Sequence, residues 1–272
     1  MDNSKQLPVI AFDMDGTLMT HQDAIHPKDI ELLTMADPPA IFVPTTGRSL
    51  YAIRRIFSEF KICNGSPLSF PMVLQNGSLI YNPGEKLLRY TPLELSTQNE
   101  LIRLFKTQPD VAFLLFSEDR LRLLNATEFG LSETRRYMFD PEIYDDDAPA
   151  VACSKILCIG QDPEKVREIR EMVRDFNLEV ALSKPTILEF NAPGVNKGSG
   201  LEYLVEANGW DKHRVFCAGD GDNDLEMFRR FDISFTPSTS SEEIKKRVTH
   251  VIDTHRDGLL SSILHTIERE KI

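Results

Sequence analysis

The sequence predicts an α/β fold in which a parallel sheet is interrupted by an inserted α+β domain. Three short apolar runs each end in polar residues, and each is followed by apolar residues at helical spacing. This alternation of strand, polar turn and helix is typical of a parallel sheet covered by helices. Between the second and third of these units, strands and helices follow one another without that alternation. A chain of 272 residues is long enough to bury a core in both parts.

The apolar runs assigned to the parallel sheet are short and rich in β-branched residues. They cover residues 9–12, 40–43 and 214–218. Apolar spacing predicts a helix over 49–60 and another that contains Leu225 and Phe228. Ligands of open α/β sheets bind beyond the carboxyl ends of the strands, so the polar residues after these runs are the first candidates for a site.

Four polar side chains follow these strand ends. Asp13 and Asp15 come after the first run, Thr46 after the second and Asp220 after the third. Because the carboxyl ends of parallel strands meet at one edge of the sheet, we expect these side chains at a single rim, although they span more than two hundred positions.

The middle of the chain predicts a separate α+β domain with a sheet of its own. We expect this insertion to cover residues 85–187 and the α/β core to consist of 1–84 and 188–272. The predicted strands of the middle segment are 87–90, 111–116, 121–124, 155–159, 180–183 and 187–191, and the predicted helices are 94–106 and 163–176.

The net charge of −11 argues against general nucleic-acid binding, which needs a basic surface. It leaves an anionic substrate possible, because a local cluster of cations can override the overall charge. No apolar run approaches the roughly 20 residues of a membrane span. The first residues lack a signal-peptide pattern, and the four cysteines are scattered in or near apolar runs, so we expect buried free thiols and a cytoplasmic location.

An acidic segment at 140–149 contains turn-forming residues as well as five carboxylates. We interpret it as a solvated loop, with a second metal site as the alternative.

Asp13 and Asp15 lie two residues apart at a strand end, just before Gly16. Two carboxylates so close repel each other, which raises the pKa of one of them. A cation would relieve this repulsion, and acid–base chemistry could use the difference between the two groups. The alternative is an ordinary polar turn after a strand.

Two further segments have the composition of a phosphate-binding site. Thr46, Gly47 and Arg48 are placed where a strand gives way to a helix, whose free N–H groups attract a phosphate. A simple helix cap is the alternative for Thr46. Lys197 lies among glycines, in a loop before a helix predicted to begin near Leu201, and a surface lysine is the alternative there.

The segment 219–224 combines Asp220, Asp222, Asn223 and Asp224. A calcium loop is excluded because Leu225 and Phe231 stand where glycine and glutamate would be needed. An acidic cluster that faces Asp13 and Asp15 from a neighbouring strand is the better interpretation. Oxygen ligands with several carboxylates favour Mg²⁺.

Taken in order, these segments resemble the four motifs of the haloacid dehalogenase-like phosphohydrolase superfamily. The matching segments are 13–17, 46–48, Lys197 and 219–224. The insertion resembles the α+β cap of the Cof-type subgroup, and residues 73–81 resemble the segment that precedes that cap. The resemblance implies a Rossmann-like parallel-sheet core with an inserted cap that sets substrate specificity. The chain departs from the family pattern after the fourth motif, at 232–238.

The resemblance also implies a role for each matching residue. Asp13 is expected to be the nucleophile that forms an aspartyl-phosphate, and Asp15 the acid and base that serves the leaving oxygen and then water. The remaining residues are expected to hold the metal or the phosphate. Mg²⁺ is assigned to Asp13, Asp15, Asp220 and Asp224, and the phosphoryl group to Thr46, Gly47, Arg48, Lys197 and Asn223.

The predicted activity is therefore Mg²⁺-dependent hydrolysis of a small phosphorylated metabolite such as a sugar phosphate. A phosphomutase of the same fold is one alternative. A non-enzymatic protein that binds a phosphorylated metabolite is the other, although all three central carboxylates, Asp13, Asp15 and Asp220, are present.

Overall fold

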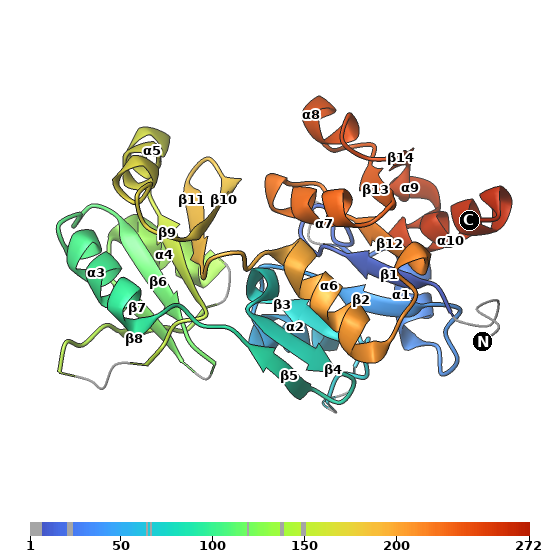
Figure 1. Ribbon diagram of the computed structural model, residues 1–272, viewed down its shortest axis with the longest axis horizontal. Coiled ribbons are helices and arrows are strands. Elements are labelled where there is room, and N and C mark those ends of the chain that lie inside the picture. The colour runs from blue at the N-terminus through green and yellow to red at the C-terminus, as the bar shows by residue number, and fades with distance from the viewer. Residues whose placement is uncertain are drawn as a thin grey trace. The chain divides into compact units, whose positions relative to one another are not determined.

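The chain divides into two compact units (Figure 1). The first unit contains residues 1–89 and 196–272, and the second contains 90–195. The second unit begins and ends later than the predicted bounds of 85 and 187. The strand at 86–90 pairs with a strand of the first unit, and the strand at 187–191 pairs with strands of the second unit. The computed structural model describes residues 7–20, 24–63, 65, 67–118, 120–136, 139–147 and 151–272.

The first unit is built on a five-stranded sheet in the order β14-β13-β12-β1-β2, and every pair of neighbours is parallel. The α/β fold predicted from the sequence is therefore confirmed, and the three apolar runs form β1, β2 and β12. The strands are β1 (Val9–Phe12), β2 (Ile41–Pro44), β12 (Val215–Ala218), β13 (Ile233–Pro237) and β14 (His250–Ile252).

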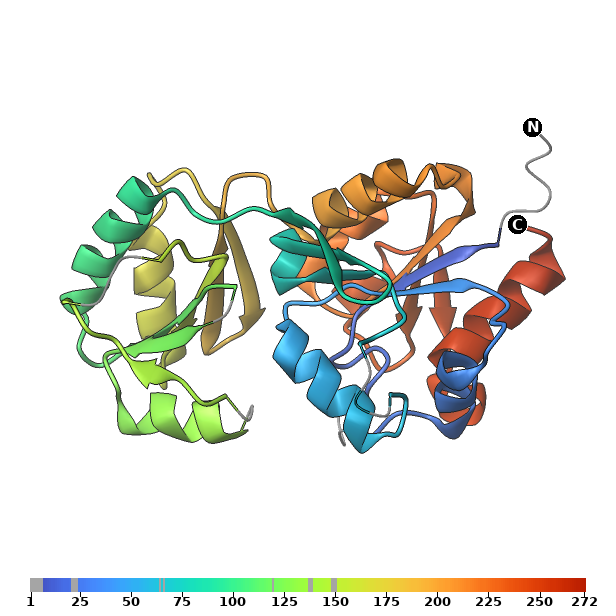
Figure 2. The same ribbon diagram turned by 90° about the horizontal axis from the view of Figure 1, so that it is seen from below.

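Helices lie on both faces of this sheet, as Figure 2 shows. On one face, Val9 and Ala11 of β1 pack with Leu201 and Met227 from two of the helices. Burial on both faces explains why the central strands β1 and β12 are apolar at every position. The helices of the first unit are α1 (Pro27–Thr34), α2 (Leu50–Glu59), α6 (Lys197–Asn208), α7 (Leu225–Arg230), α8 (Glu242–Lys245), α9 (Thr254–Asp257) and α10 (Leu259–Glu270).

A small three-stranded sheet completes the first unit. It has the order β3-β4-β5 and consists of β3 (Met72–Leu74), β4 (Leu79–Asn82) and β5 (Lys86–Tyr90). The expectation that residues 87–90 belong to the insertion is wrong, because this strand pairs with β4 of the first unit. The turn between β3 and β4 contains Asn76 at φ 58° and Gly77 at φ 99°, conformations that asparagine and glycine tolerate best.

The second unit has a six-stranded sheet in the order β10-β11-β9-β6-β7-β8. Its neighbours are antiparallel except for the parallel pair β7–β8. One apolar cluster forms between the sheet and α3 and α5, and a second lies on the opposite side of the strands with Phe129 and Leu131 of α4. The elements are α3 (Leu95–Lys106), β6 (Ala112–Phe116), β7 (Leu121–Leu124), α4 (Glu128–Arg136), β8 (Glu142–Ile143), β9 (Lys155–Ile159), α5 (Pro163–Met172), β10 (Glu179–Lys184) and β11 (Ile187–Asn191).

The acidic segment 140–149 was predicted to be a solvated loop, and the structure corrects part of that prediction. Glu142 and Ile143 form β8 and pair with Arg122 and Leu123 of β7. Asp146 forms an ion pair with Lys106. The last two positions, 148 and 149, lie outside the described residues. The only set of metal-ligating side chains found among the described residues lies in the first unit, so nothing supports a metal site in this segment.

The structure bears on the expected lack of membrane spans and on the expected buried thiols. Within the described residues, no helix combines the length and apolar character that a membrane crossing requires. Cys153, Cys158 and Cys217 are buried free thiols, whereas Cys63 is partly exposed.

Candidate active site

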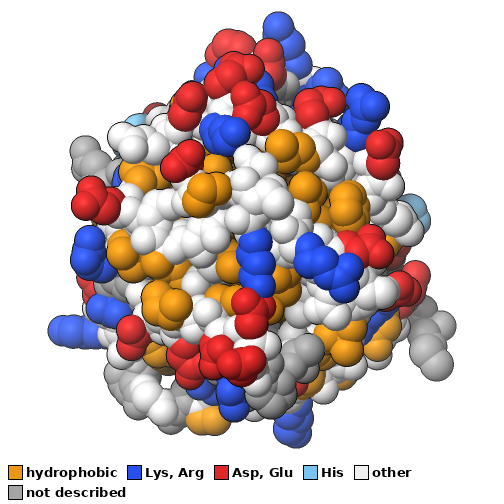
Figure 3. Space-filling view, turned by 90° about the vertical axis from the view of Figure 1, so that its left-hand side faces the viewer, with side chains coloured by type: hydrophobic (Ala, Val, Ile, Leu, Met, Phe, Trp, Pro, Cys, Tyr) orange, Lys and Arg blue, Asp and Glu red, His pale blue; other side chains and the backbone are white. Residues whose placement is uncertain are grey.

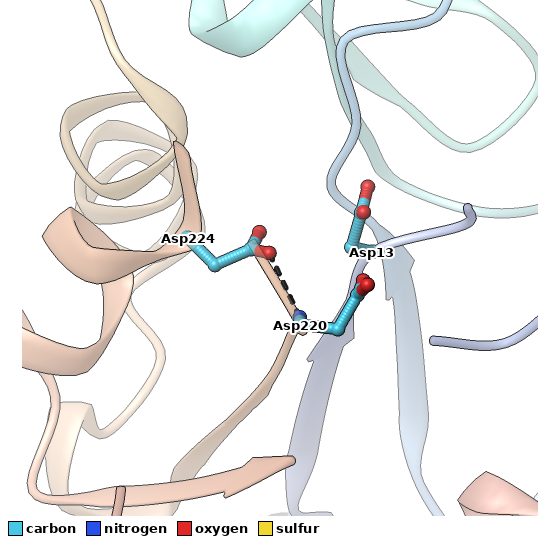
Figure 4. Close-up of side chains that lie close together, drawn as sticks. All are labelled: Asp13, Asp220 and Asp224. Atoms are coloured by element: carbon cyan, nitrogen blue, oxygen red, sulfur yellow. Dashed lines mark hydrogen bonds between the residues drawn. The ribbon is translucent and has the colours of Figure 1, made fainter. Parts of the chain in front are cut away.

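Two neighbouring strands deliver the first two carboxylates of the site. Asp13 directly follows β1, and Asp220 follows β12 with one residue between them. The backbone N–H of Asp13 donates to the carbonyl of Ala218 at 2.9 Å. Asp13 is buried, at 6% exposure. Figure 4 shows Asp13 and Asp220 projecting from adjacent strand ends, with Asp224 across from them. The rim predicted from the sequence therefore exists for these residues.

Asp13, Asp220 and Asp224 form one compact cluster. Each offers a carboxylate oxygen, and these oxygens lie within 4.8 Å of one another. Lys197 adds the counter-charge, with its Nζ 2.8 Å from Asp13 and 2.7 Å from Asp224. Lys197 and Asp224 are fully buried, so water does not weaken this ion pair as it would at the surface.

Lys197 is the first residue of α6, not part of a loop. The expected helix start near Leu201 is wrong because Asn196 and Ser199 form a capping box that begins the helix four residues earlier. The Asn196 side chain accepts from the Ser199 N–H, and the Ser199 hydroxyl accepts from the Asn196 N–H. This cap fixes the start of the helix and thereby the direction of the Lys197 side chain.

The buried charges shift one another's pKa values. Burial raises the pKa of Asp13 to about 7; Lys197 opposes this shift, and Asp224 and Asp15 add to it. Burial also raises the pKa of Asp224, again opposed by Lys197. For Lys197 burial acts in the lowering direction, but the two carboxylates outweigh it and the pKa rises above its ordinary value. The lysine therefore stays cationic beside the two carboxyl groups.

Asp224 organises the loop after β12. One of its oxygens accepts the N–H groups of Asp220 and Gly221 at 3.0 Å each, and the other accepts from Lys197. A side chain at Gly219 would lie 2.3 Å from Asp224, so only glycine fits there. Three donors thus already hold this carboxylate in place.

Thr17 and Gly16 lie next to the Asp220 carboxylate, although neither was predicted as a site residue from the sequence. The Thr17 hydroxyl donates to Asp220 Oδ1 at 2.7 Å. Gly16 has φ 78°, and a Cβ there would lie 2.3 Å from Asp220 Oδ2. Gly16 and Thr17 belong to the segment 13–17 together with Asp13 and Asp15. Their position in this segment is the sequence signal that could have identified them as site residues.

Asp15 is not one of the three carboxylates that group together, which are Asp13, Asp220 and Asp224. Its carboxylate is held by Arg48, with Nε 2.7 Å from Oδ2 and Nη2 2.5 Å from Oδ1. The Asp15 side chain is 47% exposed and that of Arg48 is 15% exposed. Both were predicted as site residues, and the structure joins them to each other by a two-pronged ion pair.

Thr46 and Gly47 lie in a loop before α2. The helix begins at Leu50 and is capped by Ser49, so the expectation that Thr46 stands at the helix start is wrong. The Thr46 backbone bonds to Val73 and Asn76, while its hydroxyl accepts from the Arg48 N–H at 3.2 Å. The turn between β3 and β4 therefore fixes this loop.

Asn223 occupies the middle of the short 3₁₀ turn Asp222–Asp224 and is partly exposed. The structure thus brings four of the predicted residues together. The clustered four are Asp13, Lys197, Asp220 and Asp224.

The cluster has the composition of a site for a hard divalent cation. All of the side-chain ligand atoms are oxygens, which suits Mg²⁺. Thr17 orients Asp220, and a side chain at Gly16 would collide with the second oxygen of Asp220. Asp13 and Asp220 would supply the carboxylates, whereas Asp224 is already held by its three donors.

The chain is similar to known proteins over almost its whole length. A family model described as haloacid dehalogenase-like hydrolase matches residues 10–264. The 5-amino-6-(5-phospho-D-ribitylamino)uracil phosphatase YcsE of Bacillus subtilis is 23% identical over 263 residues, and the match covers 96% of each chain. The pyridoxal phosphate phosphatase YbhA of Escherichia coli is 23% identical, over 95% of this chain and 97% of its own.

A solved structure has a similar fold. The crystal structure of TM0651 from Thermotoga maritima superposes with a TM-score of 0.80 at 25% identity, over 96% of this chain and 98% of that one. The similarity includes both units, because almost the whole length of each chain is covered.

Proposed function

The chain belongs to the haloacid dehalogenase-like hydrolases and is a phosphatase of that family, and on this basis we propose that it hydrolyses a small phosphorylated metabolite with Asp13 as the nucleophile and Mg²⁺ as the cofactor. The observation that carries the proposal is the contact of Asp13 with Lys197 at 2.8 Å beside Asp220 and Asp224.

Asp13 suits nucleophilic attack on phosphorus. Asp13 lies at the carboxyl end of β1, where the hydrogen bond from its backbone N–H to the Ala218 carbonyl fixes the main chain. Attack would form an aspartyl-phosphate on Asp13 and expel the alcohol oxygen of the substrate. Water would then hydrolyse this intermediate and release inorganic phosphate.

Asp13 and Asp220 would hold Mg²⁺, with the backbone carbonyl of Asp15 as the further expected ligand. Mg²⁺, when bound, would neutralise negative charge shared by the nucleophile and the phosphate. Asp224 would act on Lys197 and on the loop rather than on the cation directly. This division of roles follows from the donors that already occupy its carboxylate.

The phosphoryl oxygens would be held by the remaining residues of the rim. Lys197 supplies a buried positive charge, and Thr46, the Gly47 N–H and Asn223 supply neutral donors. Preorganised donors of this kind stabilise the charge of the transition state because they need no rearrangement.

Asp15 would transfer the proton. In the structure its carboxylate is engaged by Arg48, so it must turn from this ion pair before it can protonate a leaving oxygen. Arg48 would then be a positioning residue for Asp15, and the phosphate-binding role assigned to it from the sequence would be secondary.

The relatives indicate the class of substrate. One acts on a uracil that carries a phosphorylated ribityl chain and the other on pyridoxal phosphate. Both substrates are small organic phosphate monoesters, and a sugar phosphate would belong to the same class. We propose that residues of the second unit distinguish among such substrates, because the site residues assigned in the first unit serve the phosphate and the metal.

The test uses the purified chain with Mg²⁺ and p-nitrophenyl phosphate. Asp13→Asn should reduce kcat by about 10⁴-fold or more, as loss of a nucleophile does in enzymes of known mechanism. Asp37→Asn, an exposed carboxylate of the same unit, is the matched control and should leave turnover unchanged. Turnover retained in Asp13→Asn would contradict the proposal, as would full activity after complete removal of divalent cations.

A further inference from the structure

The turn between β3 and β4 contains three successive residues in the left-handed region. Gln75, Asn76 and Gly77 have φ values of 50°, 58° and 99°. All three residues are buried. L-residues adopt this region at a cost in free energy, and such conformations persist only where the surrounding structure enforces them. They gather at functional sites, so the contacts that enforce this turn indicate what it serves.

The first half of the turn fixes the loop 46–48. The Gln75 N–H donates to the Arg48 carbonyl at 3.1 Å, and the Asn76 N–H donates to the Thr46 carbonyl at 3.0 Å. The Thr46 N–H donates in turn to the carbonyl of Val73 in β3, at 2.9 Å. Because these main-chain groups of the loop are engaged by β3 and its turn, the loop keeps its place only as long as the turn keeps its own.

The second half of the turn lies against the first turn of α6. A Cβ at Gly77 would lie 2.4 Å from the carbonyl oxygen of Asn196 and 3.4 Å from the Cα of Gly200. The contact is reciprocal, since a Cβ at Gly200 would lie 2.7 Å from the Cα of Gly77. Side chains that project into solvent, like the basic ones in Figure 3, can move aside for an added methyl group, whereas two packed main chains cannot.

The Asn196 carbonyl that meets Gly77 is the one at which α6 begins. It accepts from the Gly200 N–H at 3.0 Å and from the Ser199 hydroxyl at 3.1 Å. The next residue is Lys197, whose Nζ contacts the two buried carboxylates. A displacement of this carbonyl would therefore move the main chain of Lys197.

The two glycines that follow Lys197 are explained by the same close packing. Gly200 meets the β3–β4 turn, and a Cβ at Gly198 would lie 2.4 Å from the carbonyl oxygen of Glu226 in α7. The first turn of α6 is therefore confined by main-chain atoms of two different elements. Glycine at these positions lets the helix approach both elements closely.

We propose that Gly77 is a positioning residue for phosphate binding, because the turn that contains it touches both segments assigned to the phosphoryl oxygens. The lack of a side chain at this position sets the spacing between the loop 46–48 and Lys197. Gly77 itself would contact neither phosphate nor metal, and its role rests on the proposed function, which assigns these two segments to the phosphate.

Calorimetric titration of the full chain with inorganic phosphate, in saturating Mg²⁺, measures this role. Gly77→Ala should weaken phosphate binding about tenfold or more, as loss of a hydrogen bond to a charged group does. The kcat/KM for p-nitrophenyl phosphate should fall about 10²-fold, the effect of a misplacement of about 1 Å. Mg²⁺ affinity in the absence of phosphate should stay unchanged, because Asp13 and Asp220 are placed by the pairing of β1 with β12.

Two further variants separate the collision from the backbone conformation. Gly84 has a left-handed φ of 75°, but no atom of the described residues lies within 4 Å of an added Cβ, so Gly84→Ala should bind phosphate normally. Gly200→Ala introduces the collision at a helical position, where alanine suits the backbone, and should weaken phosphate binding as Gly77→Ala does. Gly200→Ala decides the question alone if Gly77→Ala fails to fold.

The positioning role is overturned if Gly77→Ala and Gly200→Ala bind phosphate as Gly84→Ala does. It is also overturned if they lose Mg²⁺ affinity to the same degree as phosphate affinity, which would show a general disruption of the unit. Turnover retained in Asp13→Asn would instead contradict the proposed function, so the two failures are distinguishable.

Discussion

The guanidinium of Arg48 holds both carboxylate oxygens of Asp15, at 2.7 and 2.5 Å, and so engages the expected proton donor in an ion pair. An ion pair of this geometry restricts the side chain of Asp15 to one direction. The Asp15 side chain must therefore leave Arg48, or move together with it, during the catalytic cycle. Substitution of either residue tests this requirement.

Asp15→Asn should lower kcat for an alkyl phosphate by about 10² to 10⁴-fold, the usual contribution of a general acid. The loss should be much smaller for p-nitrophenyl phosphate, whose leaving group needs no proton. Arg48→Gln should give a smaller loss, since Asp15 remains present. Steady-state kinetics on both substrates measure this difference, and equal losses on the two substrates would argue against a proton-transfer role for Asp15.

Lys197→Met should leave Asp13 and Asp224 buried without their cation. We expect loss of activity and destabilisation of about 3–5 kcal/mol in metal-free buffer, the cost of breaking a buried ion pair. Lys155→Met, which breaks the buried pair with Glu189 in the second unit, is the control for stability. Mg²⁺ should raise the Tm of both variants, because both keep Asp13 and Asp220, and the absence of any rise in either would show that these carboxylates do not bind the cation.

Gly16→Ala should abolish Mg²⁺ binding, because its Cβ would lie 2.3 Å from Asp220 Oδ2. Gly84 has a similar φ of +75° but open space around it, so Gly84→Ala shares the backbone strain without the collision. Both variants should lose about 1 kcal/mol of stability from the strained φ. Calorimetric titration with Mg²⁺ should distinguish them, and normal affinity in Gly16→Ala would be inconsistent with Asp220 as a ligand.

Asp29 should make the stability of the first unit depend on pH. Its buried carboxylate accepts the N–H groups of Leu259 and Leu260, at the start of α10, at 2.7 and 2.9 Å. Burial nevertheless raises its pKa from 3.8 to about 6. Because the folded state then holds the proton more tightly than the unfolded state, stability contributed by this group is complete below pH 3.8 and is lost as pH rises through 6.

The loss amounts to roughly 3 kcal/mol, since each unit of pKa difference corresponds to about 1.4 kcal/mol. Asp29→Asn cannot titrate, so urea unfolding at several pH values in metal-free buffer should show a flatter profile for this variant. If the two profiles run parallel between pH 4 and 6, the pKa of Asp29 is not raised by burial.

The sequence predicts those parts of the fold whose signal is local. The strands β1, β2 and β12 were found because apolar runs ended in polar residues, and the meeting of Asp13 with Asp220 followed from the geometry of parallel strands. The start of α6 was missed because a capping box of Asn196 and Ser199 lies among glycines that disfavour helix.

Other features depended on contacts that sequence spacing does not encode. The pairing of Asp15 with Arg48 joins two segments through side-chain rotamers, and nothing in either segment favours it over a phosphate contact. Strand β8 was missed because two residues are too few for a periodic pattern, and its pairing with β7 provides the stabilisation instead. The assignment of β5 likewise depends on its partner β4 rather than on its own residues.

The position of β1 between β2 and β12 has a consequence for the synthesis of the protein. Thr17 and Asp220, which share a hydrogen bond, are separated by 203 positions. While the ribosome is still adding residues, Asp13 has no neighbour from β12 and no Lys197, whereas residues 90–195 can already collapse as a unit. A nascent chain therefore remains catalytically silent until Asp220 and Asp224 have emerged, and a truncation between residues 196 and 219 removes the chemistry although the residues of the second unit are all present.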